Sequence, residues 1–146
     1  MDVTIKFQKL HDNVEIPKYE TDDASGMDLC AFLEEDIELA PMERLLIPTG
    51  LKIEIPKGYE AQIRPRSGLS IKYGISLVNC VGTIDADYRG EVKIPLINLS
   101  KETFIIKNGF RVAQMVIAPV CKAKIEQSEA LSETKRDKGG FGSTGI

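Results

Sequence analysis

Short stretches in which apolar and polar residues alternate, separated by proline and glycine, run through most of this chain. Seven prolines and twelve glycines supply the breaks, at intervals of roughly 8–12 residues, which is typical of β-sandwiches and barrels. The alternating stretches lie at residues 3–7, 37–39, 44–47, 51–55, 59–63 and 103–106. A period of two predicts strands with one buried face. We therefore predict an all-β fold, with at most one helical turn, at 67–73, for which Ser67 is the N-cap.

The length, charge and hydropathy of the chain restrict its class. A chain of 146 residues is long enough for one domain with a hydrophobic core. The net charge of −3 argues against an extended nucleic-acid surface, which needs clustered positive charge. The start of the chain does not resemble a signal peptide, and no apolar run reaches the ~18 residues of a membrane span. We expect no nucleic-acid partner, no membrane partner, and a cytoplasmic or nuclear location.

Cysteine and histidine are too few and too widely separated for several kinds of site. Cys30, Cys80 and Cys121 are odd in number, which is typical of free thiols in a reducing compartment. All three have apolar neighbours, so we expect them to be buried core thiols. His11 is the single histidine, which argues against a zinc site and against a Ser-His or Cys-His pair. Any chemistry therefore depends on carboxylates, hydroxyls, amides and arginines.

Residues 82–91 carry the densest set of reactive side chains in the chain. They read Gly-Thr-Ile-Asp-Ala-Asp-Tyr-Arg-Gly-Glu between two apolar stretches, which predicts a β-hairpin around an Asp-rich turn. If Asp85 and Asp87 are extended, they lie on one face of a strand. A carboxylate beside an apolar strand can act as a general base toward water. The alternative is an Asp-rich surface turn without a chemical role.

Three further features each have a structural and a functional interpretation. Residues 64–70 bring two arginines into a Ser-Gly bend, which either cradles an anion or is a surface turn paired with local acids. Asp28 lies among apolar residues, so it is either an ion-pair partner or part of a site. Gln114 lies inside an apolar strand, where its amide bonds either the backbone or a ligand.

The composition changes at residue 127. The end of the chain has a basic cluster, then one aromatic residue among glycines, then two hydroxyls. Glycines let N–H groups approach phosphate, and an aromatic ring can stack on a base. The alternative is a terminus that does not fold. The Gly-Lys-Ser/Thr ending of a Walker loop is lacking. We predict a β-barrel domain over 1–126 and a flexible, glycine-rich arm over 127–146.

Five stretches, taken together and in order, resemble the family of trimeric deoxyuridine triphosphate nucleotidohydrolases (dUTPases). They are residues 24–31, 64–70, 82–91, 111–114 and 136–145. The resemblance implies a distorted jelly-roll barrel, the dUTPase-like β-clip, and an enzyme that hydrolyses dUTP to dUMP and pyrophosphate. Such enzymes limit uracil in DNA and supply dUMP for thymidylate synthesis. The resemblance also implies a homotrimer with shared active sites, in which the arm closes over the site as a lid.

The resemblance assigns the nucleoside end of the substrate to one group of residues. Asp85 would be the general base, deprotonating a water that attacks the α-phosphorus. The backbone of 82–85 would read the uracil edge, and Tyr88 would pack on the deoxyribose and exclude a 2′-hydroxyl. The implied contacts at this end are Asn79, Gly82, Thr83, Ile84, Asp85, Tyr88 and, less directly, Lys93.

A second group is implied at the phosphates. Arg136 would reach the γ-phosphate, Phe141 would stack over the uracil, and Asp28 would support the site through water or an arginine. Mg²⁺ would be held by substrate phosphates and water, with no direct protein ligand, which suits a sequence without a dedicated metal cage. The implied phosphate contacts are Arg66, Ser67, Gly68, Gln114, Arg136, Gly142 and Ser143.

One position departs from the family pattern. Asp137 follows the arm arginine where the family usually has glycine. A carboxylate beside a phosphate contact repels the substrate, and aspartate lacks the freedom of glycine at positive φ. We expect the lid to close, but more weakly.

Three other functions fit parts of the sequence. The dCTP deaminases share the fold and attack the pyrimidine ring, but Asn79, Tyr88 and the glycine-rich arm favour a dUTPase. The second alternative is a catalytically silent, nucleotide-binding regulatory trimer, and the presence of Asp85 argues against it. A general β-barrel binding module explains the hairpins but not the five ordered stretches.

Overall fold

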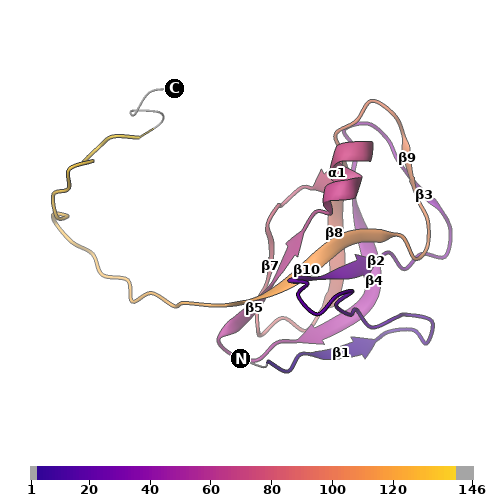
Figure 1. Ribbon diagram of the computed structural model, residues 1–146, viewed down its shortest axis with the longest axis horizontal. Helices are drawn as coiled ribbons and strands as arrows, with labels where there is room; N and C mark the ends of the chain where they lie inside the picture. The colour runs from indigo at the N-terminus through magenta and orange to yellow at the C-terminus, as the bar shows by residue number, and fades with distance from the viewer. Residues whose placement is uncertain (1–2, 141–146) are drawn as a thin grey trace.

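The computed structural model describes residues 3–140, which form ten strands and one short helix (Figure 1). The strands and helix are β1 (Lys6–Lys9), β2 (Gly26–Cys30), β3 (Ile37–Leu39), β4 (Arg44–Glu54), β5 (Tyr59–Arg64), α1 (Ser67–Tyr73), β6 (Ile75–Leu77), β7 (Gly82–Ile84), β8 (Glu91–Asn98), β9 (Phe104–Ile106) and β10 (Arg111–Pro119). The predicted all-β class is confirmed. Within 3–140, no helix has the length and apolar character that crossing a membrane requires.

Two four-stranded antiparallel sheets make up the body. One has the order β1-β4-β8-β6, the other has the order β2-β10-β5-β7, and β3 pairs with β9 in a separate ribbon. Neighbours in each sheet are mostly distant in sequence, so the chain crosses repeatedly between the sheets. This arrangement confirms the distorted jelly roll, although the described strands do not close into one hydrogen-bonded barrel.

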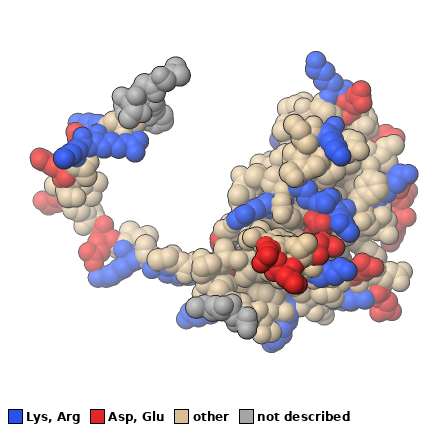
Figure 2. Space-filling view, viewed as in Figure 1, with Lys and Arg blue, Asp and Glu red and all other residues tan. Residues whose placement is uncertain are grey.

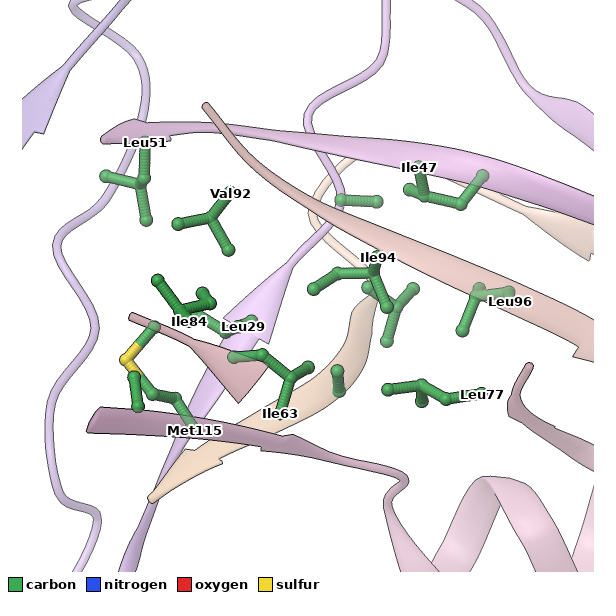
Figure 3. Packing of buried hydrophobic residues seen from close by; sticks show 14 of the residues in the cluster. Leu29, Ile47, Leu51, Ile63, Leu77, Ile84, Val92, Ile94, Leu96 and Met115 are labelled. Atoms are coloured by element: carbon green, nitrogen blue, oxygen red, sulfur yellow. The ribbon is translucent and has the colours of Figure 1, made fainter. Parts of the chain in front are cut away.

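The core lies between the two sheets, where apolar side chains from both interdigitate (Figure 3). Strand β8 shows the cause, since Val92, Ile94 and Leu96 are buried while the residues between them face outward. Each such side chain contributes about 1.5–3 kcal/mol when fully buried. The opposite wall comes from Leu29, Ile63, Ile84 and Met115. The alternating pattern of the sequence is therefore the pattern of the core.

Strand β4 is longer than the sequence predicts. A break was expected at residues 48–50, but the strand runs on from Arg44 to Glu54 with an irregularity between Pro48 and Lys52. Gly50 has φ +67 there, a conformation that glycine adopts readily. The Glu91 carboxylate accepts the Gly50 N–H at 2.9 Å, which supplies a partner that the regular ladder does not. The proline and glycine mark a bulge instead of a turn.

The predicted hairpin around 82–91 is correct only in its outer arms. Strand β6 pairs with β8, but β7 pairs with β5 in the opposite sheet. The chain therefore leaves one sheet after β6, adds β7 to the other, and returns as β8. Asp85 follows β7, and Asp87 lies in the turn after it. The condition under which both carboxylates would share one strand face is not met, because the strand ends before them.

The predicted helical turn is confirmed as α1, but its N-cap is not Ser67. Arg66 occupies the cap position in an extended conformation, and Ser67 is the first helical residue. No side chain caps the helix at this end. The helix ends at Gly74, whose φ of +66 is the left-handed conformation common at helix C-termini. The sequence 64–70 therefore turns directly from strand β5 into the helix.

The expectation of three buried thiols is wrong. Cys30 is half-buried, while Cys80 and Cys121 are exposed. Cys80 lies in the irregular segment between β6 and β7, and Cys121 follows the last strand. Apolar neighbours in sequence indicate burial only within a regular strand, where alternation determines which face of the sheet each side chain occupies. Both exposed cysteines lie outside such elements.

Candidate active site

A pocket of about 420 Å³ lies beside the β7–β8 connection. Seven residues assigned to the nucleoside end from the sequence line it: Asn79, Gly82, Thr83, Ile84, Asp85, Tyr88 and Lys93. The remaining lining residues are Leu46, Ile63, Glu91, Val92 and Pro95, which sequence reasoning did not single out. Leu46 and Pro95 face each other across the β4–β8 ladder. Their positions depend on strand pairing, so no local sequence signal marks them.

Gly82 allows one wall of this pocket to form. It pairs with Ile63 of β5, and a Cβ at position 82 would come within 3.3 Å of the Asn79 amide nitrogen. The absence of a side chain therefore lets the Asn79 amide lie against the start of β7. Ile84, two residues further on, points into the core. The backbone of β7 and the Asn79 side chain, which precedes the strand, thus line the pocket together.

Tyr88 is held at the pocket by its own turn. Its hydroxyl donates to the Glu91 carbonyl at 2.9 Å, and its ring lies directly over Gly90. A Cβ at Gly90 would lie 2.3 Å from the hydroxyl oxygen, so only glycine permits this packing. The Arg89 guanidinium donates to the carbonyls of Ala86 and Tyr88 at 2.7 and 2.8 Å, which closes the turn.

The carboxylate of Asp85 is available for chemistry. Asp85 is exposed at the end of β7, and the Tyr88 N–H donates to its backbone carbonyl at 3.1 Å. Within residues 3–140, no hydrogen bond or ion pair engages its side chain. Glu91, the other acid of the pocket, bonds the Gly50 N–H and lies 3.6 Å from the Lys93 ammonium. Asp85 is therefore the pocket carboxylate that can accept a proton from a bound water.

The residues assigned to the phosphates form a second group around the junction of β5 and α1. The Arg66 Nε lies 2.8 Å from the Asp28 Oδ1, and the Gln114 amide donates to the Pro65 carbonyl at 2.9 Å. Asp28 therefore has the arginine partner that the structural interpretation required, and Gln114 has the backbone partner. Ser67 and Gly68 are exposed on the first turn of α1. A Cβ at Gly68 would meet no described atom within 4 Å, so space remains above this turn.

Register explains why these side chains meet. Gln114 of β10 is opposite both Arg64 of β5 and Asp28 of β2, so the three form one row across the sheet. Met27, Leu29 and Met115 alternate with this row and point into the core. Arg66 follows Arg64 by two residues and continues on the same side past the end of β5. The sheet therefore gathers a polar face from three strands that are far apart in sequence.

The two groups do not meet within one chain. The pocket at Asp85 shares no lining residue with the hollow of about 530 Å³ that contains Arg66, Leu69 and Arg111. Arg136 is exposed on the extended segment that leaves the body after β10 (Figure 1). Phe141, Gly142 and Ser143 lie outside the described residues. A single chain therefore presents the two ends of the expected site separately.

The arm contains one ordered turn at the position that departs from the family pattern. Asp137 has φ +43, in the left-handed region that favours glycine. The Thr134 hydroxyl accepts the Asp137 N–H at 3.0 Å, and the Arg136 Nε donates to the Gly139 carbonyl at 2.8 Å. The Gly139 N–H in turn donates to the Arg136 carbonyl at 2.9 Å. The backbone therefore takes the conformation of a glycine although the residue is aspartate.

Charge and donor chemistry limit what the site can hold. Figure 2 shows acidic and basic side chains interspersed over the face that it presents. Within residues 3–140, no three Asp, Glu, His or Cys side chains lie close enough to form a metal site. Mg²⁺ commonly binds one or two carboxylates together with substrate phosphates and keeps several waters. A Mg²⁺ that arrives with substrate phosphates and keeps its waters needs no such cluster of protein ligands.

Comparisons with known proteins agree with this geometry. A family profile described as dUTPase matches residues 12–145. A deoxyuridine 5'-triphosphate nucleotidohydrolase of Finegoldia magna is 59% identical over 133 residues, covering 91% of this chain and 93% of that protein. The protein of the same name from Thermoanaerobacter sp. is 53% identical over 148 residues and is covered completely, as is this chain.

Solved structures of dUTPases are also similar to this chain. A variant dUTPase of Staphylococcus bacteriophage 80alpha with dUpNHpp superposes with a TM-score of 0.84 at 27% identity, covering 98% of this chain and 99% of that chain. A variant dUTPase from phage phi11 of S. aureus, whose structure describes the coordination of a structural Mg(II) ion, superposes with a TM-score of 0.80 at 26% identity, covering 89% and 99%. With the ordered motifs, the jelly roll and these relatives in agreement, the chain belongs to the dUTPase family.

Proposed function

We propose that this chain hydrolyses dUTP to dUMP and pyrophosphate, with Asp85 as the general base. The observation that carries this proposal is the pocket whose wall combines the free Asp85 carboxylate with Asn79, Tyr88 and the backbone edge of β7. Family membership supports the same reaction.

The reaction is a hydrolysis at the α-phosphorus. Asp85 orients a water and accepts its proton while the water oxygen bonds to the α-phosphorus. The bond from that phosphorus to the bridging oxygen breaks, and pyrophosphate leaves with the electron pair. The proton on Asp85 then passes to solvent. Catalysis rests on positioning and charge neutralisation, as is general for phosphoryl transfer.

Recognition of the nucleoside uses the pocket. The Asn79 amide and the backbone of 82–85 bond the uracil edge, where donors and acceptors must match a flat polar ring. The Tyr88 ring, fixed over Gly90, packs on the deoxyribose and leaves no room for a 2′-hydroxyl. Lys93 lies on the same wall and contacts the nucleoside end.

Recognition of the triphosphate uses the second group. Arg66, Ser67 and Gly68 bind phosphate oxygens, and the Gln114 amide adds a contact after releasing the Pro65 carbonyl. Arg136, with Gly142 and Ser143 of the arm, reaches the γ-phosphate end, and Phe141 covers the uracil. Mg²⁺, when bound with the substrate, supplies charge neutralisation at the phosphate oxygens.

The separation of the two groups supports a homotrimer with shared sites. The pocket of one chain needs a phosphate cradle, and Arg66, Ser67, Gly68 and Gln114 of the same chain do not line that pocket. A neighbouring copy supplies the missing half, and the arm of a copy supplies the lid. Mixing an Asp85→Asn chain with an Arg66→Gln chain tests this: the mixture regains dUTP cleavage if sites are shared and remains inactive if each chain works alone.

The decisive assay is pyrophosphate release from dUTP with Mg²⁺, alongside dTTP, dCTP and UTP. We expect cleavage of dUTP alone, and loss of about 10³-fold or more in kcat for Asp85→Asn. Asp87→Asn is the matched control, because Asp87 is an exposed aspartate two residues away that does not line the pocket. Ammonia release from dCTP would support a deaminase instead, and no reaction with any nucleotide would support a silent binding protein.

A further inference from the structure

We infer that Arg111 is a positioning residue, which orients the Arg66 guanidinium toward the triphosphate through Asp28. Arg111 itself has no assigned contact with substrate. This inference rests on the proposed function, since it concerns the phosphate end of the same site.

Three residues, Asp28, Arg66 and Arg111, form a closed set of contacts. The Arg66 Nε lies 2.8 Å from the Asp28 Oδ1, and the Arg111 Nη1 donates to the Asp28 Oδ2 at 3.4 Å. The Arg66 Nη1 donates to the Arg111 backbone carbonyl at 3.2 Å. Both oxygens of one carboxylate are therefore engaged by two different arginines. The same residue, Arg111, bonds Asp28 with its side chain and Arg66 with its backbone.

These contacts fix the plane of the Arg66 guanidinium. A single bond at Nε leaves the group free to tilt, whereas bonds at Nε and Nη1 together define the plane of this rigid fork. A guanidinium has five N–H donors, and within residues 3–140 only two of them are engaged. The other three remain for an anion. Asp28 and Arg66 side chains are only 20% and 31% exposed, so solvent screens their ion pair less than a surface pair.

A β-bulge explains why Arg111 reaches this set at all. The register of β10 against β2 shifts between Arg111 and Ala113, so that Arg111 pairs with Cys30 and Gln114 pairs with Asp28. In a regular strand, residues 111 and 114 would face opposite sides. The extra residue, Val112, is buried together with Ala113, which brings Arg111 onto the polar face beside Gln114.

Arg111 also forms a weak ion pair with Glu20 on its outer side, and this pair provides a control for the contact with Asp28. The Arg111 Nη2 lies 3.8 Å from the Glu20 Oε1, and both side chains are about half exposed. Exposed pairs at such a distance contribute little. The positioning effect should therefore depend on Asp28 and not on Glu20.

The test compares Arg111→Gln with two matched variants. Glu20→Gln removes the weak outer pair, and Lys107→Gln removes one exposed cation from a 3.8 Å ion pair with Asp36 elsewhere. For each protein, the dissociation constants of dUpNHpp and of deoxyuridine are measured with Mg²⁺, together with KM and kcat for dUTP and the melting temperature. Binding constants remain informative even if wild type cleaves no nucleotide, which separates this inference from the proposed reaction.

We expect Arg111→Gln to weaken dUpNHpp binding by about tenfold, with deoxyuridine binding changed less than about twofold. KM for dUTP should rise more than kcat falls. Arg111→Lys, which keeps the charge but not the fork, should recover only part of the loss. In the Asp28→Asn background, Arg111→Gln should add little, because both act through one carboxylate.

Two results would overturn the inference. Equal losses for dUpNHpp and deoxyuridine would mean that Arg111 supports only the fold. Unchanged dUpNHpp binding, or a loss equal to that of Lys107→Gln, would mean that Arg66 needs no such support. If Arg111→Gln fails to fold, Arg111→Lys provides the test. Its dUpNHpp binding should then weaken more than its deoxyuridine binding, and equal losses would overturn the inference.

Discussion

Replacing Gly90 with alanine should displace the Tyr88 ring while leaving the fold in place. A Cβ at position 90 would lie 2.3 Å from the Tyr88 hydroxyl oxygen and 2.5 Å from its Cζ, so the ring must move. Tyr88 is 45% exposed and can swing into solvent. The movement breaks the bond from its hydroxyl to the Glu91 carbonyl. One such bond is worth about 1 kcal/mol, so the free energy of unfolding should fall by about that amount.

The effect on specificity should be larger than the effect on stability. In the proposed function, the Tyr88 ring excludes the 2′-hydroxyl of a ribonucleotide. Discrimination by a tight pocket wall is worth about 1–3 kcal/mol, so the preference for dUTP over UTP in kcat/KM should fall by about tenfold or more.

The assay measures kcat/KM for dUTP and UTP in wild type, Gly90→Ala and Tyr88→Phe, with urea unfolding of each protein. Tyr88→Phe keeps the ring and loses only the hydroxyl, so its preference should stay near that of wild type. An unchanged preference in Gly90→Ala would refute the steric reasoning. A loss above ~3 kcal/mol in unfolding free energy would show that Gly90 serves the fold itself.

Three further results are expected. Asp137→Gly should lower KM for dUTP by about threefold to fivefold, because a left-handed backbone costs a non-glycine residue about 1 kcal/mol; an unchanged KM would contradict this. Gly26→Ala should weaken dUpNHpp binding more than deoxyuridine binding, since its Cβ would lie 2.6 Å from the Gln114 Oε1; equal effects would argue against Gln114 as a phosphate contact. A thiol reagent near neutral pH should label the two exposed cysteines before Cys30. Burial raises the pKa of the Cys30 thiol, and the thiolate is the reactive form, so its rate should increase as pH rises; equal rates by peptide mass mapping would contradict this.

Local patterns predicted the strands and the motifs well. The period of two in β8 and the breaks at proline and glycine are short-range signals, and the structure follows them at Val92, Ile94 and Leu96. The same signals misled at residues 48–50, where a bulge looks like a turn in sequence. A bulge depends on a distant partner, in this case the Glu91 carboxylate on another strand.

The pairing between strands that are distant in sequence could not be predicted from local patterns. Nothing in residues 82–84 indicates that β7 joins β5 instead of β8. Nor does any local sequence pattern indicate the bulge that turns Arg111 toward Asp28, or that Arg66 lies outside the pocket beside Asp85.

Hydrolysis of dUTP in water enriched in heavy oxygen addresses the role of Asp85 and the point of attack together. Water attack on the α-phosphorus predicts that the label enters dUMP and that pyrophosphate stays unlabelled. Asp85→Asn should lose the labelled product without losing dUpNHpp binding. Label in pyrophosphate, or labelled dUMP at the wild-type rate from Asp85→Asn, would contradict the mechanism.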